Sequence, residues 1–569
     1  MNIKSFRTRI KIISVFIFLG ASILVVRLFF VQIIHNNFYS EKADKQYITP
    51  ASDIFDRGVI FFSQKDGSMG SAATVMTGYK IAISPKNIID PEVLYNSLSK
   101  IIELDYDNFM VKVSKKNDPY EEIANRLTKE TADQIAALHF PEVSIFKEKW
   151  RFYPGGSLAS HTIGFLAFKE NDLMGQYGLE RFYNKTLAKQ KDDFYVNFFA
   201  EVFSNLRDTF SESKTGDIVA TIEQTTQQVL ESELKNTMEK WNADQIGGII
   251  MDPITGEIYA ISAMPDFNLN EFGKISDVKY YRNPFVEDVI EFGSVIKPLV
   301  VAGALDQGVL TPETTYTDNG FVVVDKKTIN NFDKKGRGPN TTMQTVLDQS
   351  LNTGMVFVQS KMGHDTFRSY MKNYGIGEKT GIDLPNETSG LIKNLESPRN
   401  IEYANAAFGQ GISMTPIEAV RAFSSLANGG NLIVPHLVKE IKYEDGTSKK
   451  IFLEPTRTGL IKKETGDTIT RMLIHVFDSY GEGSYKFDHY SIASKTGTAQ
   501  VPMENGKGYY DDRHNHSFFG YFPAYDPKFI VFLYMKNPKQ VNYASQTLIP
   551  PFVNITKFLI NYYSIAPDR

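Results

Sequence analysis

The sequence feature that most constrains this chain is a set of three short motifs in a fixed order. They are Ser294-Val-Ile-Lys297, Ser350-Leu-Asn352 and Lys495-Thr-Gly-Thr498. A serine and a lysine three residues apart lie on one face of a helix, and a serine hydroxyl needs a nearby base to become a nucleophile. The three motifs together therefore predict a nucleophilic serine assisted by lysine, with a second serine–asparagine pair and a Lys-Thr-Gly strand beside it.

Each motif alone carries little information, because the chain holds other copies. Further Ser-x-x-Lys matches begin at Ser97, Ser144, Ser211, Ser276 and Ser369, and further Lys-Thr-Gly matches begin at Lys214 and Lys379. Ser294 is favoured because the apolar run 295–305 predicts a buried helix, with Pro298 acceptable in its first turn. Lys495 is favoured because it alone continues as Lys-Thr-Gly-Thr, in a stretch that predicts a strand at a sheet edge. The competing interpretation of Ser294 is an ordinary helix N-cap.

Five longer segments add to these motifs. They are Arg57-Gly-Val-Ile60, residues 151–161 (RFYPGGSLASH), Gly178-Leu-Glu-Arg-Phe182, residues 247–260 and residues 407–416. Together with the motifs they resemble class B penicillin-binding proteins, the monofunctional peptidoglycan D,D-transpeptidases of cell division or elongation. The sequence departs from that family at Phe292, where proline is usual, at Leu351, and at Phe62-Ser63, where Asp-Arg often stands.

The resemblance implies the reaction. A donor stem peptide ending in D-Ala-D-Ala would acylate Ser294 and release D-alanine, and the amine of a neighbouring stem peptide would resolve the acyl-enzyme. β-Lactams mimic the terminal dipeptide and would acylate the same serine. The alternatives are a D,D-carboxypeptidase or β-lactamase-type hydrolase, which transfers the acyl group to water, and a non-catalytic scaffold of a wall-synthesis complex. No cofactor or metal is expected, although His514-Asn-His516 has the spacing of a metal pair.

The chemistry assigns a role to each polar motif residue. Lys297 takes a proton only when neutral, so burial and the second cation should lower its pKa from about 10.4. Ser350 would shuttle a proton to the leaving amine, and Asn352 would hold the substrate amide. The backbone N–H groups of Ser294 and Thr498 would form an oxyanion hole. The donor peptide would add to the edge strand as a further strand. Its last residues and terminal carboxylate would contact Lys495, Thr496, Gly497 and Thr498.

The N-terminus predicts a membrane anchor. Four basic residues precede residues 12–34, an apolar run of 23 residues whose only charge is Arg27. Such a helix is about 34 Å long, enough to cross the hydrocarbon core. The basic flank predicts a single-pass inner-membrane protein with a cytoplasmic N-terminus and an extracytoplasmic catalytic domain. A signal peptide cleaved near Gly20-Ala-Ser22 is the alternative. The free-energy cost of placing Arg27 within the membrane is lowest where a partner helix faces it. The resemblance implies a polytopic glycan polymerase and other division or elongation proteins as partners.

We therefore expect a multidomain α+β chain. Its parts are a cytoplasmic tail (1–11), a transmembrane anchor (12–34), a mixed α/β pedestal module like a dimerisation domain (35–221), and a transpeptidase domain (222–569) with the antiparallel sheet and helices of penicillin-binding proteins and serine β-lactamases. Near the boundary we expect a strand at 218–222, a helix at 226–241 and strands at 246–251 and 257–263. The net charge of −4 gives no reason to expect nucleic acid, and the lack of cysteine excludes disulfides and thiol catalysis.

Overall fold

The computed structural model describes residue 22 and residues 56–169, 172–189, 214–503 and 508–569. The described chain forms two compact units, a smaller one of residues 75–150 and a larger one of residues 57–74 and 151–569. The expected cytoplasmic tail, and all of the expected anchor except Ser22, lie outside the described residues. No helix in the described ranges is long and apolar enough to cross a bilayer.

The smaller unit is a layer of strands covered by short helices. Its elements are the later part of β2 (Met69–Ile83), η3 (Pro85–Asn87), α3 (Pro91–Leu98), α4 (Tyr106–Val113), β3 (Glu121–Leu127), α5 (Lys129–Ala136) and β4 (Val143–Phe152). β2 and β3 pair in antiparallel register, with Ile81 opposite Ala124. Asp90, Asp105 and Thr128 cap the three α-helices through their side-chain oxygens, which satisfies N–H groups that lack a partner within the helix. The core lies between strands and helices, with Ile81, Leu98 and Phe109 buried.

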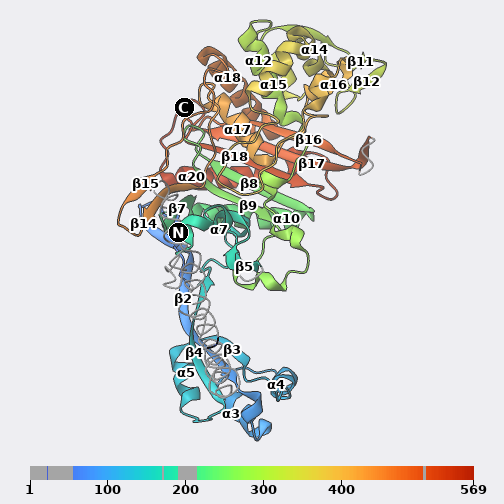
Figure 1. Cartoon of the computed structure of the whole chain (residues 1–569). Helices are drawn as coiled ribbons and strands as arrows, with labels where there is room; N and C mark the ends of the chain where they lie inside the picture. The colour runs from blue at the N-terminus through green and yellow to red at the C-terminus, as the bar shows by residue number, and fades with distance from the viewer. Residues whose placement is uncertain (1–21, 23–55, 170–171, 190–213, 504–507) are drawn as a thin grey trace, which may run out of the picture. The chain divides into compact units, whose positions relative to one another are not determined.

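The larger unit is built on a five-stranded antiparallel sheet (Figure 1). Its strands, in spatial order, are β16 (Ala493–Pro502), β17 (Tyr509–Phe522), β18 (Phe529–Lys536), β8 (Gln245–Met251) and β9 (Ile258–Met264). β8 and β9 confirm the two strands expected after the helix, and α10 (Gln224–Trp241) confirms the helix itself. β16 is an edge strand, as predicted for Lys495.

Both faces of this sheet are buried, which explains the nearly continuous apolar sequence of β17 and β18. Phe518 and Leu533 belong to one core with side chains of α10 and α20 (Ile549–Tyr563). Their neighbours Phe519 and Phe532 belong to a second core, in which the Phe519 ring stacks on Phe423 of α17 (Pro416–Ala427) at 4.3 Å. Alternate residues of a strand point to opposite faces, so the sheet separates two hydrophobic layers.

α12 and α14, which carry Lys297 and Asn352, lie together with α15 above the sheet in the view of Figure 1. The helices here are η6 (Gly293–Ile296), α12 (Lys297–Gln307), α13 (Met343–Asp348), α14 (Asn352–Met362), α15 (His364–Asn373), η7 (Lys393–Glu396), α16 (Asn400–Ala406), α18 (Lys463–Ser479) and η8 (Tyr480–Gly483). Two small hairpins join them, with strands β10 (Thr315–Asp318), β11 (Phe321–Val324), β12 (Lys327–Asn330) and β13 (Gly338–Thr342). α12 is buried along residues 297–304, as its apolar sequence predicted.

A second, mixed sheet of the larger unit contains β1 (Ile60–Ser63), the start of β2, β7 (Gly216–Glu223), β14 (Val438–Tyr443) and β15 (Ser448–Lys450). β1 pairs with β7 in parallel and β7 pairs with β14 in antiparallel orientation. β7 confirms the strand expected at 218–222, and the expected boundary after residue 221 falls within it. The short elements that complete the unit are α6 (Ser160–Ile163), β5 (Leu166–Lys169), β6 (Asp172–Gly175), α7 (Gly178–Phe182), α8 (Asn184–Leu187), η4 (Leu269–Lys274), η5 (Val278–Tyr281), α11 (Pro284–Glu287) and α19 (Ala544–Thr547).

Three of the segments that resemble family signatures meet in one buried ion cluster. The carboxylate of Glu180, which is fully buried, accepts hydrogen bonds from Nε of Arg57 and Nε of Arg151, each at 2.6 Å. Arg57 also donates to the backbone oxygen of Glu180 at 2.8 Å, and Arg151 donates to the backbone oxygen of Gly58 at 2.8 Å. The cluster therefore ties the chain before β1 to β4 and α7.

Candidate active site

Ser294 lies in the short η6 turn that leads into α12. The serine makes no side-chain capping bond at this helix start, so the N-cap interpretation is wrong. Gly293 before it has φ of +66°, and a Cβ atom there would lie 2.5 Å from the backbone oxygen of Thr498. Glycine is therefore required for the Ser294 turn to approach the edge strand β16.

Phe292 fixes the same turn from the other side. Its ring is buried and packs edge-on against Phe532 of the central sheet, with ring centroids 5.1 Å apart. Its backbone oxygen accepts a hydrogen bond of 2.7 Å from Oγ of Ser517 in β17. The residue that departs from the family pattern thus anchors the Ser294 turn in the hydrophobic core.

Lys297 begins α12 and its side chain is completely buried. Its Nζ atom donates to the backbone oxygen of Ser350 at 2.6 Å and to Oδ1 of Asn352 at 2.9 Å, and it lies 3.2 Å from Oγ of Ser350. Burial, and then the charge of Lys495, lower the pKa of Lys297 well below its ordinary value. The structure thus brings together the first two motifs around an amine that is easily kept neutral.

Lys495 reaches the same serine from the edge strand. Its Nζ atom lies 3.2 Å from Oγ of Ser350 and 3.0 Å from the backbone oxygen of Thr496. Burial lowers the pKa of Lys495 to about 7. Ser350 sits between the two lysines in the left-handed backbone region, with φ of +53°. Such a conformation costs free energy in a non-glycine residue and is often found at functional sites.

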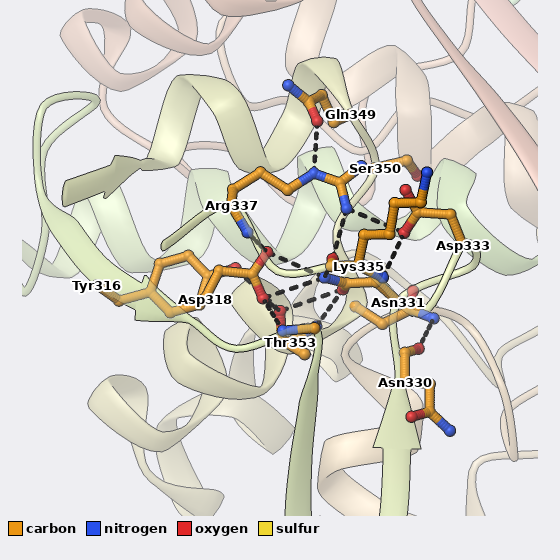
Figure 2. Close-up of polar contacts among 12 residues, drawn as sticks. Tyr316, Asp318, Asn330, Asn331, Asp333, Lys335, Arg337, Gln349, Ser350 and Thr353 are labelled. Atoms are coloured by element: carbon orange, nitrogen blue, oxygen red, sulfur yellow. Dashed lines mark hydrogen bonds and ion pairs between the residues drawn. The ribbon is translucent and has the colours of Figure 1, made fainter. Parts of the chain in front are cut away.

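The buried carboxylate of Asp318 holds the backbone around Ser350 and Thr353 in place, as Figure 2 shows. Asp318, which is 1% exposed, accepts hydrogen bonds from Oγ1 of Thr353 at 2.8 Å and from Nδ2 of Asn331 at 3.0 Å. Asn331 in turn accepts from the backbone N–H of Thr353 at 3.2 Å. The neighbouring Asn330 offers its backbone oxygen to Nδ2 of Asn352 at 3.0 Å. The amide of Asn352 is therefore oriented at both ends, by Lys297 and by Asn330.

The third motif lies in β16, next to the turn that holds Ser294. A Cβ atom on Gly497 would lie 2.5 Å from the backbone oxygen of Phe292 and 3.0 Å from the backbone nitrogen of Val295, so glycine allows the strand to touch the Ser294 turn. The backbone N–H of Thr496 donates to the hydroxyl of Tyr480 at 3.0 Å. Oγ1 of Thr498 accepts from the backbone N–H of Ala544 at 3.2 Å. The edge strand is thus fixed at Thr496 and at Thr498.

The other copies of the motifs lie elsewhere in different surroundings. Four other Ser-x-x-Lys matches lie within the described ranges, at Ser97, Ser144, Ser276 and Ser369. In all four the lysine is exposed, and the serine is exposed in all but the first, where Ser97 is half-buried. The match at Ser211 begins outside the described residues. In the two other Lys-Thr-Gly matches, Lys214 and Lys379 are exposed and lie outside helices and strands. Among these described copies, only the Ser294 match combines a helix start with a buried lysine.

Sequence reasoning missed the residues that support the motifs. Asp318, Asn331 and Tyr480 carry no recognisable spacing relative to the motif residues, and only the fold brings them to the site. Of the two histidines that have metal-pair spacing, His516 is buried with Nδ1 2.8 Å from Oγ1 of Thr547, and burial lowers its pKa to about 4.

The chain is similar to penicillin-binding proteins and peptidoglycan transpeptidases along most of its length. The family model described as penicillin binding protein transpeptidase domain matches residues 246–556, and that described as penicillin-binding protein dimerisation domain matches residues 71–217. Stage V sporulation protein D of Bacillus subtilis is 30% identical over 91% of this chain and 81% of its own length. The probable peptidoglycan D,D-transpeptidase PenA of Neisseria gonorrhoeae is 26% identical over 96% of this chain and 91% of its own length. The crystal structure of penicillin binding protein 2X from Streptococcus thermophilus superposes with a TM-score of 0.71 at 21% identity, covering 89% of this chain and 79% of that one.

Proposed function

Because the chain belongs to the penicillin-binding protein transpeptidase family, we propose that it is a serine D-Ala-D-Ala transpeptidase that cross-links peptidoglycan through an acyl-enzyme on Ser294. One observation carries the proposal. Two buried lysines, Lys297 and Lys495, each lie 3.2 Å from the hydroxyl of Ser350. Burying two lysines around one hydroxyl costs stability, and ionisable groups perturbed in this way are typical of functional sites.

The first step is removal of the Ser294 proton by Lys297. A neutral lysine has two N–H groups and one lone pair. The backbone oxygen of Ser350 and Oδ1 of Asn352 accept the two N–H groups. The lone pair is then free to take a proton from a hydroxyl, which is what a general base requires. The lowered pKa of Lys297 supports this role.

The proton then passes through Ser350 to the leaving group. As Ser294 attacks the penultimate D-alanine carbonyl carbon, the bond to the terminal D-alanine breaks and its nitrogen needs a proton. The hydroxyl of Ser350 donates that proton and regains one from Lys297. Lys495, which is partly protonated near neutral pH, stabilises the anionic character of Ser350 during the transfer and faces the terminal carboxylate of the donor.

The edge strand binds the donor and stabilises the tetrahedral intermediate. The backbone N–H groups of Ser294 and Thr498 form the oxyanion hole, an arrangement worth about 3–4 kcal/mol per donor in a comparable serine enzyme. The donor peptide adds to β16 as a further strand, and Thr496, Gly497 and Thr498 contact its terminal residues together with Lys495. Asn352 holds the donor amide. No metal or cofactor enters this chemistry, which uses side chains and backbone alone.

We place the reaction outside the inner membrane. Residues 12–34 would anchor the chain with its N-terminus in the cytoplasm, and the module of residues 35–221, with the anchor, would meet a polytopic glycan polymerase that supplies strands for cross-linking, within a division or elongation complex. The support for this is the apolar run, its basic flank and the lone charge Arg27.

The proposal is tested with polymerised glycan strands that carry pentapeptide stems. Incubation with the purified protein should give cross-linked dimers and free D-alanine, and Ser294→Ala should give neither. Tetrapeptides and D-alanine without dimers would indicate the carboxypeptidase instead. A wild-type protein that forms no product and binds no penicillin would indicate the scaffold.

A further inference from the structure

Two exposed aromatic rings meet beside the active site. Phe332 lies in the loop between β12 and β13, and Tyr543 lies in the loop before α19. Their ring centroids are 5.8 Å apart and the planes meet at 78°, an edge-to-face contact. Phe332 is nevertheless 55% exposed and Tyr543 is 45% exposed. Each ring therefore touches the other while much of its own surface remains in solvent.

Phe332 is tied to the second motif. The residue before it, Asn331, is 1% exposed and bonded to Asp318 and Thr353. One residue earlier, the backbone oxygen of Asn330 accepts a hydrogen bond from the Asn352 amide. The loop beneath the ring is thus fixed by the residues that orient Asn352, and the ring projects from that fixed base.

Tyr543 is tied to the third motif. The residue after it, Ala544, donates its backbone N–H to Oγ1 of Thr498 at 3.2 Å. Thr547, at the other end of the same short helix, lies 2.8 Å from His516, which stands opposite Thr498 in the β16–β17 pairing. The base of this ring is therefore fixed to the edge strand.

These two attachments make the ring contact a bridge from the loop that holds Asn352 to the residue that holds Thr498. A donor peptide added to β16 runs between these same two sides to reach Ser294. We propose that Phe332 and Tyr543 form an aromatic clasp that joins these two sides of the site in the unliganded enzyme and must open before a bulky acyl side chain reaches the serine. The proposal deepens the proposed transpeptidase function and rests on it.

The exposed faces of the rings favour a clasp over a fixed binding wall. A wall ring is supported by packing against the protein body, whereas the ring contact that the structure shows for Phe332 and Tyr543 is with one another, and about half of each residue remains in solvent. Opening then selects among ligands by size. A ligand whose acyl group is small passes the closed clasp, and a ligand with a branched or aromatic acyl group waits for the open state.

The test measures the second-order rate constant for acylation of the full-length protein by two penicillins. One carries a bulky acyl side chain and the other is the bare 6-aminopenicillanic acid nucleus. Phe332→Ala and Tyr543→Ala should each raise the rate constant for the bulky compound by about two- to tenfold, the range that one aromatic pair contributes to an equilibrium. The double variant should be no faster than either single variant, because the same contact is lost. The rate constant for the bare nucleus should not change.

Three controls accompany the test. Tyr543→Phe keeps the ring and should react like the wild type. Phe452→Ala and Tyr525→Ala remove rings of 83% and 55% exposure elsewhere in the same unit and should have no effect. Slower acylation in both alanine variants would show that the rings bind the ligand as a wall, and additive or absent effects would show that they do not act as a pair. Each of these results overturns the clasp, whereas failure of the wild type to react with either penicillin would instead refute the proposed function.

Discussion

Replacing Lys495 by methionine should stabilise the protein near neutral pH. Methionine has similar length and no charge, and the Lys495 side chain is 1% exposed. Burial lowers the pKa of this lysine from 10.5 to about 7 in the folded state. At pH 7 the unfolded lysine is therefore protonated while the folded one is only half protonated, and the linkage relation gives a destabilisation of about 4 kcal/mol. Lost hydrogen bonds to Ser350 and Thr496 offset about 1–2 kcal/mol of the gain, which leaves about 2–3 kcal/mol.

The dependence on pH has a definite sign. Between pH 7 and pH 10.5 the unfolded state binds more protons than the folded state, so the wild type gains stability as pH rises. The advantage of Lys495→Met should therefore be full at pH 6 to 7 and should disappear towards pH 10.5. Removal of this cation also relieves the lowered pKa of Lys297, which acts in the same direction.

Thermal unfolding of the full-length protein in detergent measures the effect. We expect the midpoint of Lys495→Met to lie about 3–6 °C above the wild type at pH 7, with the difference shrinking at pH 9 and above. Lys557→Met, which removes an exposed lysine of α20, is the matched control and should change the midpoint little at either pH. A Lys495→Met midpoint equal to or below that of the wild type at pH 7, or a difference that does not change with pH, would refute the reasoning from burial.

Three further predictions follow from the geometry. Lys297→Arg should abolish acylation by penicillin, because a guanidinium does not serve as a base at accessible pH. Lys495→Arg should keep the positive charge and some acylation. Equal residual acylation in the two variants would contradict the separate roles of the two lysines. Glu180→Ala should destabilise the fold by about 3–5 kcal/mol, because it leaves the guanidinium groups of Arg57 and Arg151 buried without their shared carboxylate. The loss should appear as a lower midpoint of thermal unfolding. An unchanged midpoint would show that the cluster is not stabilising. Deleting residues 1–34 should preserve acylation by penicillin and yet fail to support growth; normal growth would remove the case for a membrane partner.

The sequence was sufficient for the parts of the site that depend on local spacing. The apolar run after Ser294 implied burial of Lys297, which the structure confirms. The interval from Ser294 to Lys297 implied a shared helical face, and the structure has Ser294 in the η6 turn and Lys297 as the first residue of α12. The edge position of Lys495 was likewise predictable, because a glycine-containing stretch with alternating polar residues suits the last strand of a sheet. Local pattern therefore predicted the burial of Lys297 and the edge strand that carries Lys495.

The supporting residues were not predictable because long-range packing alone selects them. Asp318 acts through hydrogen bonds to residues that follow it by 13 and 35 positions, and nothing in its own sequence context marks it as buried. Phe292 looked like a departure from the family pattern, and only the position of Phe532 explains it as a core anchor. The N-cap interpretation of Ser294 was wrong because the η6 turn precedes α12 and leaves the serine without a capping role.

Identification of the acylated residue tests the central claim most directly. Full-length protein is labelled with a fluorescent penicillin, digested, and the modified peptide is sequenced by mass spectrometry, with Ser294→Ala and Ser97→Ala treated in parallel. We predict a single acylated serine, Ser294, with labelling lost in Ser294→Ala and unchanged in Ser97→Ala. Labelling that survives in Ser294→Ala, or a modified serine elsewhere in the chain, would contradict the assignment of the nucleophile.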